Sequence, residues 1–294
     1  MAKAWEYHGH RVRRVQEGDI DQLLNIFNPR PDLILWTRTG DLAAKVGHPA
    51  QIAMLNKAAD RLIPTVGFHL DRWFGLERES QVASEPFFKC SLVITADGGH
   101  QDNFVAAGVN HMWLPPAVSL AETELGAHTT GFHSSIVFVG SWRGYHPEWT
   151  HRPELVSWLR KTYGHNVTFW PSTNQPAIRG EALRNLYASA KVVVGDSCLS
   201  GGATHYWSDR IPETVGRGGF LLHPNVEGLN NHFNIGEHLD TWDAYDWPTL
   251  QTKLDYWLRH DHARKAVQVA GREHVRTNHT YEVRVEQIIK VLAL

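Results

Sequence analysis

Short apolar runs separated by helical segments constrain the fold of this chain most. The runs with almost no polar alternation are DLILW (32–36), PTVGFHL (64–70), SLVITAD (91–97), SIVFVGS (135–141), KVVVGDS (191–197) and GFLLHP (219–224). A strand buried on both faces has such a sequence, because neither of its faces meets water. Amphipathic helical segments lie between the runs, so consecutive strands should be parallel with helices on both faces of the sheet. The pattern predicts an α/β protein.

The alternation stops between Val118 and Ser134, where turn residues follow no clear period. We therefore expect two Rossmann-like domains whose parallel sheets face each other across a cleft. The expected parts are an N-terminal domain (1–120), a linker (121–134), a C-terminal domain (135–280) and a closing helix (281–294). In the N-terminal domain a helix is expected at 2–10 and a strand at 10–15. Such a domain normally opens with a strand and a glycine turn, so we expect either a reduced domain that lacks its first strand or a chain whose start has been lost.

The composition argues against several classes of protein. The chain has 29 basic and 31 acidic residues, and its net charge of −2 disfavours a globally basic nucleic-acid-binding protein. No apolar run approaches the roughly 20 residues of a membrane span, and the N-terminus lacks the apolar middle of a signal peptide. Cys90 and Cys198 give no disulfide framework. A cytoplasmic location is the natural expectation.

The common cofactor motifs are missing from the sequence. It holds no G-x-G-x-x-G after a strand and no G-x-x-x-x-G-K-[ST], which argues against a dinucleotide oxidoreductase and a P-loop enzyme. The pairs His8/His10 and His260/His262 have no partner at a recognised metal-ligand spacing. We therefore predict neither a metal site nor a bound cofactor.

One stretch, YWSDRIPETVGRGGFLLHP (206–224), places Arg210 and Glu213 just before a glycine turn that opens a buried run. A carboxylate at a helix start can accept hydrogen bonds from the ribose hydroxyls, and a guanidinium can bind a diphosphate through two N–H groups. The amides of Gly218 and Gly219 can approach phosphate because no Cβ obstructs them. The structural alternative is a capping carboxylate with an Arg210–Glu213 surface salt bridge.

The C-terminal half resembles the GT-B glycosyltransferases, specifically the CgeB-like branch near the retaining family-4 enzymes. The segments that carry the resemblance are IVFVGS (136–141) with Arg152, LYASAKVVVGDS (186–197), SDRIPETVGRGGFLLHPNVEGLNNHF (208–233) and HVRTNHTYEVRVEQII (274–289). The N-terminal half matches more loosely through PDLILW, GFHLDRW and AAGVNHMWLPPAV, and FHLDRWFGLERE is similar to phage-encoded members.

This resemblance implies a nucleotide-diphosphate sugar as co-substrate, a hydroxyl acceptor and metal-independent transfer. Glu213 matches the glutamate that holds the donor ribose, and Arg210 matches a basic residue that stabilises the leaving diphosphate. Gly140 and Ser141 match the turn that faces the phosphates, and Arg143 is a further candidate near the diphosphate.

His205 departs from the family pattern. Family-4 enzymes carry E-x7-E, whose first glutamate touches the transferred sugar, and His205 occupies that position eight residues before Glu213. The stereochemical outcome, retaining or inverting, therefore stays open. A non-catalytic nucleotide- or sugar-binding protein of the same fold is the alternative function.

The N-terminal half is expected to hold the acceptor and any catalytic base. His69 and Asp71 lie just past a predicted strand, and a histidine beside an aspartate can accept the proton of an acceptor hydroxyl. Asp97, also after a strand, is a second candidate with a weaker claim. The alternative is that Asp71 caps a turn and His69 packs in the core.

The sequence leaves the acceptor open between a hydroxymethylated DNA base, a glycan and a protein. DNA would need a local basic patch, for which the N-terminal half offers Arg11, Arg13, Arg14, Arg38 and Arg72. The near-neutral charge mildly disfavours DNA.

Overall fold

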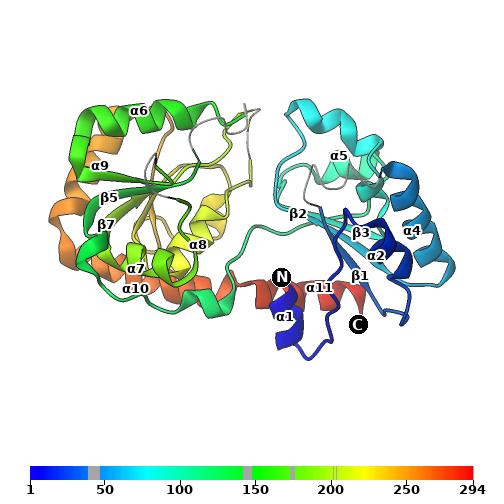
Figure 1. Ribbon diagram of the computed structural model, residues 1–294. Helices are drawn as coiled ribbons and strands as arrows, with labels where there is room; N and C mark the ends of the chain where they lie inside the picture. Colours follow the sequence, from blue (N-terminus) through cyan, green and yellow to red (C-terminus); the bar gives the residue numbers. More distant parts are fainter. Residues whose placement is uncertain (39–46, 142–147, 173–175, 201, 203, 294) are drawn as a thin grey trace. The chain divides into compact units, whose positions relative to one another are not determined.

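The computed structural model describes residues 1–38, 47–141, 148–172, 176–200, 202 and 204–293 (Figure 1). Beyond the first two residues, the chain divides into two compact units. The N-terminal unit comprises Arg11–Pro115, and the C-terminal unit comprises Lys3–His10 together with Pro116–Leu294. The boundary therefore lies at Pro115, a few residues before the linker expected from the sequence.

The described part of the N-terminal unit forms a four-stranded parallel sheet in the order β1-β2-β3-β4. Its strands are β1 (Ile34–Thr37), β2 (Thr65–His69), β3 (Leu92–Thr95) and β4 (His111–Trp113). Its helices are α2 (Ile20–Asn25), α4 (His48–Asp60) and α5 (Gln101–Ala106), with the 3-10 turns η1 (Glu77–Ala83) and η2 (Pro86–Lys89). Because the strands are parallel, their carboxyl ends share one edge of the sheet.

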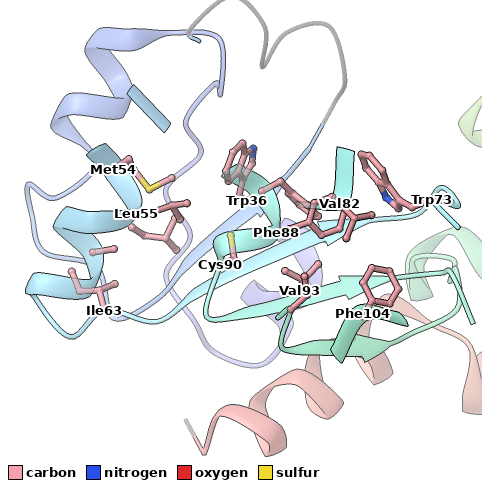
Figure 2. Packing of buried hydrophobic residues seen from close by; sticks show 14 of the residues in the cluster. Trp36, Met54, Leu55, Ile63, Trp73, Val82, Phe88, Cys90, Val93 and Phe104 are labelled. Carbon is pink, nitrogen blue, oxygen red and sulfur yellow. The ribbon is translucent and has the colours of Figure 1, made fainter. Parts of the chain in front are cut away.

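The predicted apolar runs supply the core of this unit. Figure 2 shows Trp36, Phe88 and Trp73 packed in one cluster with Met54 and Leu55 of α4. Every residue of β2 is buried, as expected of a central strand. At Gly67 in this strand, a Cβ would lie 2.8 Å from the ring of Phe87, so only glycine lets that ring rest on the sheet.

The described part of the C-terminal unit forms a five-stranded parallel sheet in the order β6-β5-β7-β8-β9. Its strands are β5 (Ser134–Val139), β6 (Val167–Trp170), β7 (Ala190–Val194), β8 (Leu221–Pro224) and β9 (Asp240–Trp242). Its helices are α1 (Ala2–Tyr7), α6 (His151–Tyr163), α7 (Gly180–Ser189), α8 (Arg210–Gly216), α9 (Trp247–Arg259), α10 (Asp261–Asn278) and α11 (Tyr281–Leu292). The remaining elements are the 3-10 turns η3 (Leu120–Thr123), η4 (Thr130–Phe132), η5 (Gly164–Asn166) and η6 (Leu229–Asn231).

Helices cover both faces of this sheet, as the alternation predicted (Figure 1). Helices α6 and α9 share one face, where Trp158 and Trp247 stack with their ring centroids 5.6 Å apart. Helix α8 packs against α10 on the other face. The shared core includes Phe138 of β5, Leu155 of α6 and Leu254 of α9.

The structure corrects the sequence at the N-terminus. Residues 10–15 form no strand, since the segment pairs with no described strand. The arginines among them are exposed. Helix α1 groups with the C-terminal unit and not with the N-terminal one. It is held there by buried Trp5 and by His8 Nε2, which donates a hydrogen bond to the carbonyl of Glu282 (2.8 Å).

None of the described helices combines the length and the apolar character that crossing a bilayer requires.

Candidate functional site

The carboxyl edge of the C-terminal sheet brings together the loops that follow β5 and β7. In the order β6-β5-β7-β8-β9 the chain leaves β5 toward β6 and returns past it to β7, so the order reverses between β5 and β7. Ligands of open α/β sheets bind outside the carboxyl ends of the strands at such a switch point. Gly140–Ser141 follows β5 and Gly195–Ser197 follows β7, which places both segments there.

Asp196 ties the segments at this edge together. Its carboxylate accepts hydrogen bonds from His151 Nδ1 (2.8 Å) and Arg152 Nε (3.0 Å), and all three side chains are buried. Arg152 also donates from Nη1 to the carbonyl of Ser141 (2.9 Å), and its guanidinium lies 3.9 Å from the ring centroid of Trp149. Arg152 therefore positions the turn after β5 relative to the end of β7.

A second group of hydrogen bonds fixes the loop between β7 and α8. Ser208 Oγ donates to the carbonyl of Asp196 (2.9 Å), and the Ser208 amide donates to Ser197 Oγ (3.0 Å). His223 Nδ1 donates to the carbonyl of Pro224 (2.7 Å), so His223 Nε2 is left to accept the Ser197 hydroxyl (3.1 Å). Burial lowers the pKa of His223 to about 4, which keeps the ring neutral at pH 7.

Arg210 and Glu213 lie in the first turn of α8, which begins at the carboxyl edge. Arg210 Nη1 is 3.3 Å from Glu213 Oε2, and each side chain is 27% exposed, so the pair is open to solvent in part. Arg217 Nη1 donates to the backbone carbonyl of Glu213 (3.0 Å). Burial raises the pKa of Glu213 and Asp209 raises it further, whereas Arg210, Arg217 and Arg179 lower it. The glutamate therefore lies among several guanidiniums, in reach of solvent.

The start of α11 belongs to the same neighbourhood. Burial raises the pKa of the Tyr281 phenol, and the carboxylates of Asp209 and Glu213 raise it further, so the phenol lies close to the start of α8. Arg284 Nη2 donates to His279 Nδ1 (2.9 Å), which fixes the turn before α11. From the sequence, Tyr281 was assigned only to the closing helix (281–294). A tyrosine at the start of that helix is the sequence signal that could have pointed to the candidate site.

His205 is held in an uncommon conformation. Its φ of +52° lies in the left-handed region, which residues other than glycine rarely adopt. Its amide donates to the carbonyl of Glu227 (2.7 Å). Its ring packs on Gly228, where a Cβ would lie 2.3 Å from His205 Cδ2. The imidazole is therefore fixed at its place in the loop before α8, and its contact with a sugar stays a prediction.

The turn after β5 is less open than the sequence suggested. The Gly140 amide donates to the carbonyl of Trp170 (2.7 Å), and the Ser141 carbonyl is held by Arg152. Arg143, the third candidate from this loop, lies outside the described residues.

Gly218 and Gly219 lie at the opposite edge of the sheet, because they precede β8 whereas Gly140 follows β5. Their amides donate to the carbonyls of Val215 (2.9 Å) and Thr214 (3.0 Å) at the end of α8. Gly218 has a φ of +80°, and a Cβ at Gly219 would lie 2.9 Å from Thr214 Cγ2. The structure gives both glycines a role in the tight turn into β8, in place of the phosphate contact expected from the sequence.

In the N-terminal unit, His69 is the last residue of β2 and Asp71 follows in the adjoining loop. His69 Nε2 lies 3.6 Å from Asp71 Oδ2; the His69 side chain is buried and that of Asp71 is 47% exposed. Burial lowers the pKa of His69, Asp71 raises it, and Arg38 and Arg78 lower it further. A neutral imidazole beside a carboxylate has the protonation state that a general base needs.

Asp97 has a structural task through one of its oxygens. Its side chain is fully buried, and Oδ2 accepts hydrogen bonds from the amides of Trp73 and Phe74 (2.9 Å each). Burial raises the pKa of this carboxyl. Asp97 therefore holds the loop after β2, next to His69 and Asp71.

The arginines considered for a DNA-binding patch have different surroundings. Arg72 is 1% exposed and cannot reach a DNA phosphate. Arg38 already faces Glu85, with Nη2 and Oε2 3.5 Å apart. Arg13 donates to the backbone carbonyls of Ile26 and Asn28. This weakens the basic patch on which DNA binding was to depend.

Across the described residues, no three His, Cys, Asp or Glu side chains gather as a metal site would require.

Comparisons with known proteins identify the fold and the family. HepE from Anabaena in complex with UDP-glucose matches with a TM-score of 0.59 at 11% identity, over 99% of this chain and 88% of that one. Sucrose-phosphate synthase from Thermosynechococcus elongatus matches with a TM-score of 0.58 at 12% identity, over 96% of this chain and 80% of that one. OtsA in its apo form matches with a TM-score of 0.60 at 11% identity, over 98% and 80% of the two chains.

A comparison with curated protein sequences gave no match. The two parallel sheets and these structural neighbours show the GT-B fold. The model of the glycosyl transferase-like family matches residues 135–290, which is more than half of the chain. The chain belongs to the glycosyl transferase-like family.

Proposed function

We propose that this protein transfers a sugar from a nucleoside diphosphate sugar to a hydroxyl acceptor, without a bound metal or cofactor. The family supports a glycosyltransferase, and a structural neighbour binds UDP-glucose. The observation that carries the proposal is the Arg210–Glu213 pair at the start of α8, because it lies partly open at the ligand-binding edge of the sheet.

In this proposal the C-terminal unit holds the donor. Glu213 accepts hydrogen bonds from the ribose hydroxyls, and Arg210 pairs with the diphosphate, whose negative charge grows as it leaves. His205 takes the place of the glutamate that would contact the sugar, and Arg143, outside the described residues, stays a candidate for a further cation. Asp196, through Arg152, positions the turn at Ser141 so that this edge is formed before the donor binds.

The N-terminal unit would supply the acceptor side of the reaction. The acceptor oxygen forms a bond to the anomeric carbon, and the bond from that carbon to the diphosphate oxygen breaks, with its electron pair leaving on the diphosphate. His69 Nε2 accepts the hydroxyl proton in an inverting reaction, and Asp71, 3.6 Å away, stabilises the resulting imidazolium. A retaining reaction needs no such base.

Calorimetric titration with UDP tests the donor site. Glu213→Ala should weaken UDP binding by roughly 100-fold, since two hydrogen bonds to a charged group contribute about 1.5–3 kcal/mol each and every 1.4 kcal/mol is about tenfold. Glu213→Gln should fall between wild type and Glu213→Ala, because it keeps the shape and loses the charge.

Glu181→Ala is the matched control, because Glu181 is an exposed glutamate in the first turn of the neighbouring helix α7. It should bind UDP as wild type does, and circular dichroism should show all four proteins folded. Equal UDP affinity in all of them would mean that Glu213 has only a structural role at the start of α8. Release of UDP from UDP-glucose in the presence of hydroxyl compounds then separates a transferase from a non-catalytic binding protein.

A further inference from the structure

Buried polar atoms without a hydrogen-bond partner gather at the carboxyl edge of the N-terminal sheet. Within the described part of the chain, this applies to Arg38 Nε, His69 Nε2, Trp73 Nε1, Asp97 Oδ1 and His100 Nε2. Buried polar groups in native proteins are nearly always paired, so a concentration of unpaired ones calls for an explanation. All five follow or end β1, β2 or β3, which is the edge at which open α/β sheets bind ligands.

Arg38 is held firmly yet keeps one donor unused. Its guanidinium lies 5.0 Å from the ring centroid of Trp73, and Nη2 is 3.5 Å from Glu85 Oε2. Arg78 approaches the same ring, with its guanidinium 5.9 Å from the centroid. The ion pair and the ring fix the plane of the Arg38 guanidinium, and the Nε–H remains for a further acceptor. A preformed guanidinium of this kind matches the oxygens of a carboxylate or phosphate.

Asp97 offers the complementary acceptor at this edge. Its Oδ2 is used by backbone amides, but Oδ1 lies 3.9 Å from both Arg72 Nε and His100 Nε2, beyond hydrogen-bond distance. A hydroxyl group is the natural partner for such an oxygen, because it donates one hydrogen bond and carries no charge. The His100 side chain is 21% exposed, so this part of the edge meets solvent.

Both hydrogen-bond donors and hydrogen-bond acceptors are left unpaired at this edge. Among the described residues, the charged side chains in these contacts include arginines 38, 72 and 78 and carboxylates 71, 85 and 97. Within the same part of the chain, Arg38 Nε and Trp73 Nε1 have no acceptor, and Asp97 Oδ1 has no donor. A ligand that satisfies the whole set brings oxyanion acceptors together with a hydroxyl donor.

We infer that the carboxyl edge of the N-terminal sheet binds an anionic hydroxyl compound, such as a sugar that carries a phosphate or a carboxylate. Arg38 takes the oxyanion, Asp97 takes a hydroxyl, and His69 faces the bound molecule between them. This inference rests on the proposed function in that the bound compound is the acceptor, and it names the class to which the acceptor belongs.

The test compares three hexoses that differ in one group: glucose 6-phosphate, glucuronate and glucose. Each is titrated calorimetrically into the full chain with UDP at saturation, so that the donor site is filled. At least one of the two anionic hexoses should bind about 10-fold or more tightly than glucose, which corresponds to one charge-assisted hydrogen bond. Which anion binds better identifies the oxyanion as phosphate or carboxylate.

Two variants and a control locate the site. Arg38→Gln should remove the preference for the anionic hexose, and His100→Asn should weaken its binding, because His100 Nε2 lies 3.9 Å from the Asp97 oxygen that takes the hydroxyl. Arg61→Gln is the matched control, because Arg61 also lies over an aromatic ring, that of Phe27 (5.2 Å), but at the end of α4. It should bind all three hexoses as wild type does.

The possible results separate this inference from the donor proposal. If UDP binds normally but neither anion binds better than glucose, the inference is wrong and the donor site stands. If an anionic hexose binds and folded Arg38→Gln and His100→Asn proteins retain that binding, the site lies elsewhere and the inference is also wrong. If UDP fails to bind while the hexose preference depends on Arg38, the donor proposal fails and the anion site stands.

Discussion

Replacement of Asp196 by alanine should lower the free energy of unfolding of the C-terminal unit by about 3–5 kcal/mol. The carboxylate is 1% exposed and accepts hydrogen bonds from His151 Nδ1 and Arg152 Nε. Its removal takes one carboxylate away from Arg152, a residue that is 5% exposed, and takes from the His151 Nδ1–H the acceptor it uses. Removing one member of a buried ion pair costs more than the pair itself contributes, because the remaining charge stays desolvated.

Urea unfolding monitored by circular dichroism measures this change. Asp196→Asn should lose less than Asp196→Ala, because the amide oxygen can still accept one of the two hydrogen bonds. Asp243→Ala is the control: Asp243 is exposed and accepts a hydrogen bond from Asn225 Nδ2 (3.3 Å), so its loss should stay within about 0.5 kcal/mol. A value that small for Asp196→Ala would show that Arg152 and His151 are satisfied in another way.

As the pH falls, both units should begin to lose stability near pH 6.5, which is well above the pH range in which carboxylates titrate. Burial lowers the pKa of His111 and of His223 to about 4 and that of His279 to about 2, from an ordinary value near 6.5. Between those values the unfolded chain binds protons that the folded chain does not, so stability is complete above pH 6.5 and falls as the pH falls. At pH 5 each of these buried histidines should cost about 2 kcal/mol, from 1.36 kcal/mol per pH unit.

Thermal melts between pH 7.5 and 4.5 test this prediction. His223 and His279 belong to the C-terminal unit, and the N-terminal unit holds His111 and His69, whose pKa burial also lowers, so the stability of both units should fall as the pH falls. The raised pKa values of Asp97 and Glu213 act in the opposite sense, because a folded state that keeps a carboxyl protonated gains stability as the pH falls. His279→Gln should flatten the pH dependence. A melting temperature that does not change between pH 7 and pH 5 would contradict the prediction.

The parallel sheets could be predicted because their strands are short apolar runs between amphipathic helices. The strand β9 (Asp240–Trp242) was missed because it contains a buried aspartate and a threonine and shows no such run. Asp240 is tolerated there because Lys253 Nζ and Trp257 Nε1 each donate to it at 2.7 Å. The strand expected at 10–15 was wrong for the opposite reason: its residues alternate, but no described strand lies beside them to pair with.

The candidate site could be predicted only where one segment holds the interacting residues. Arg210 and Glu213 lie within a single helical turn, so their spacing in the sequence already places them together. Asp196 lies 44 residues from Arg152, and only the parallel arrangement of β5 and β7 joins them. The sequence offered one signal for Asp196, its position just after a buried strand, which it shares with Asp97. The phosphate contact expected of Gly218 and Gly219 does not fit the structure, because the sequence does not show which edge of the sheet a glycine turn occupies.

The contact between His205 and Gly228 makes the side chain allowed at one of these positions depend on the other. A side chain at 228 would collide with the imidazole, and its own backbone, with φ +83°, already favours glycine. A glutamate placed at 205 would lose the flat ring that rests on that glycine, so the single exchange would leave a gap above Gly228. A library that varies residue 205 alone would therefore sample mostly damaged loops. Varying 205 and 228 together explores the combinations that this loop can accept.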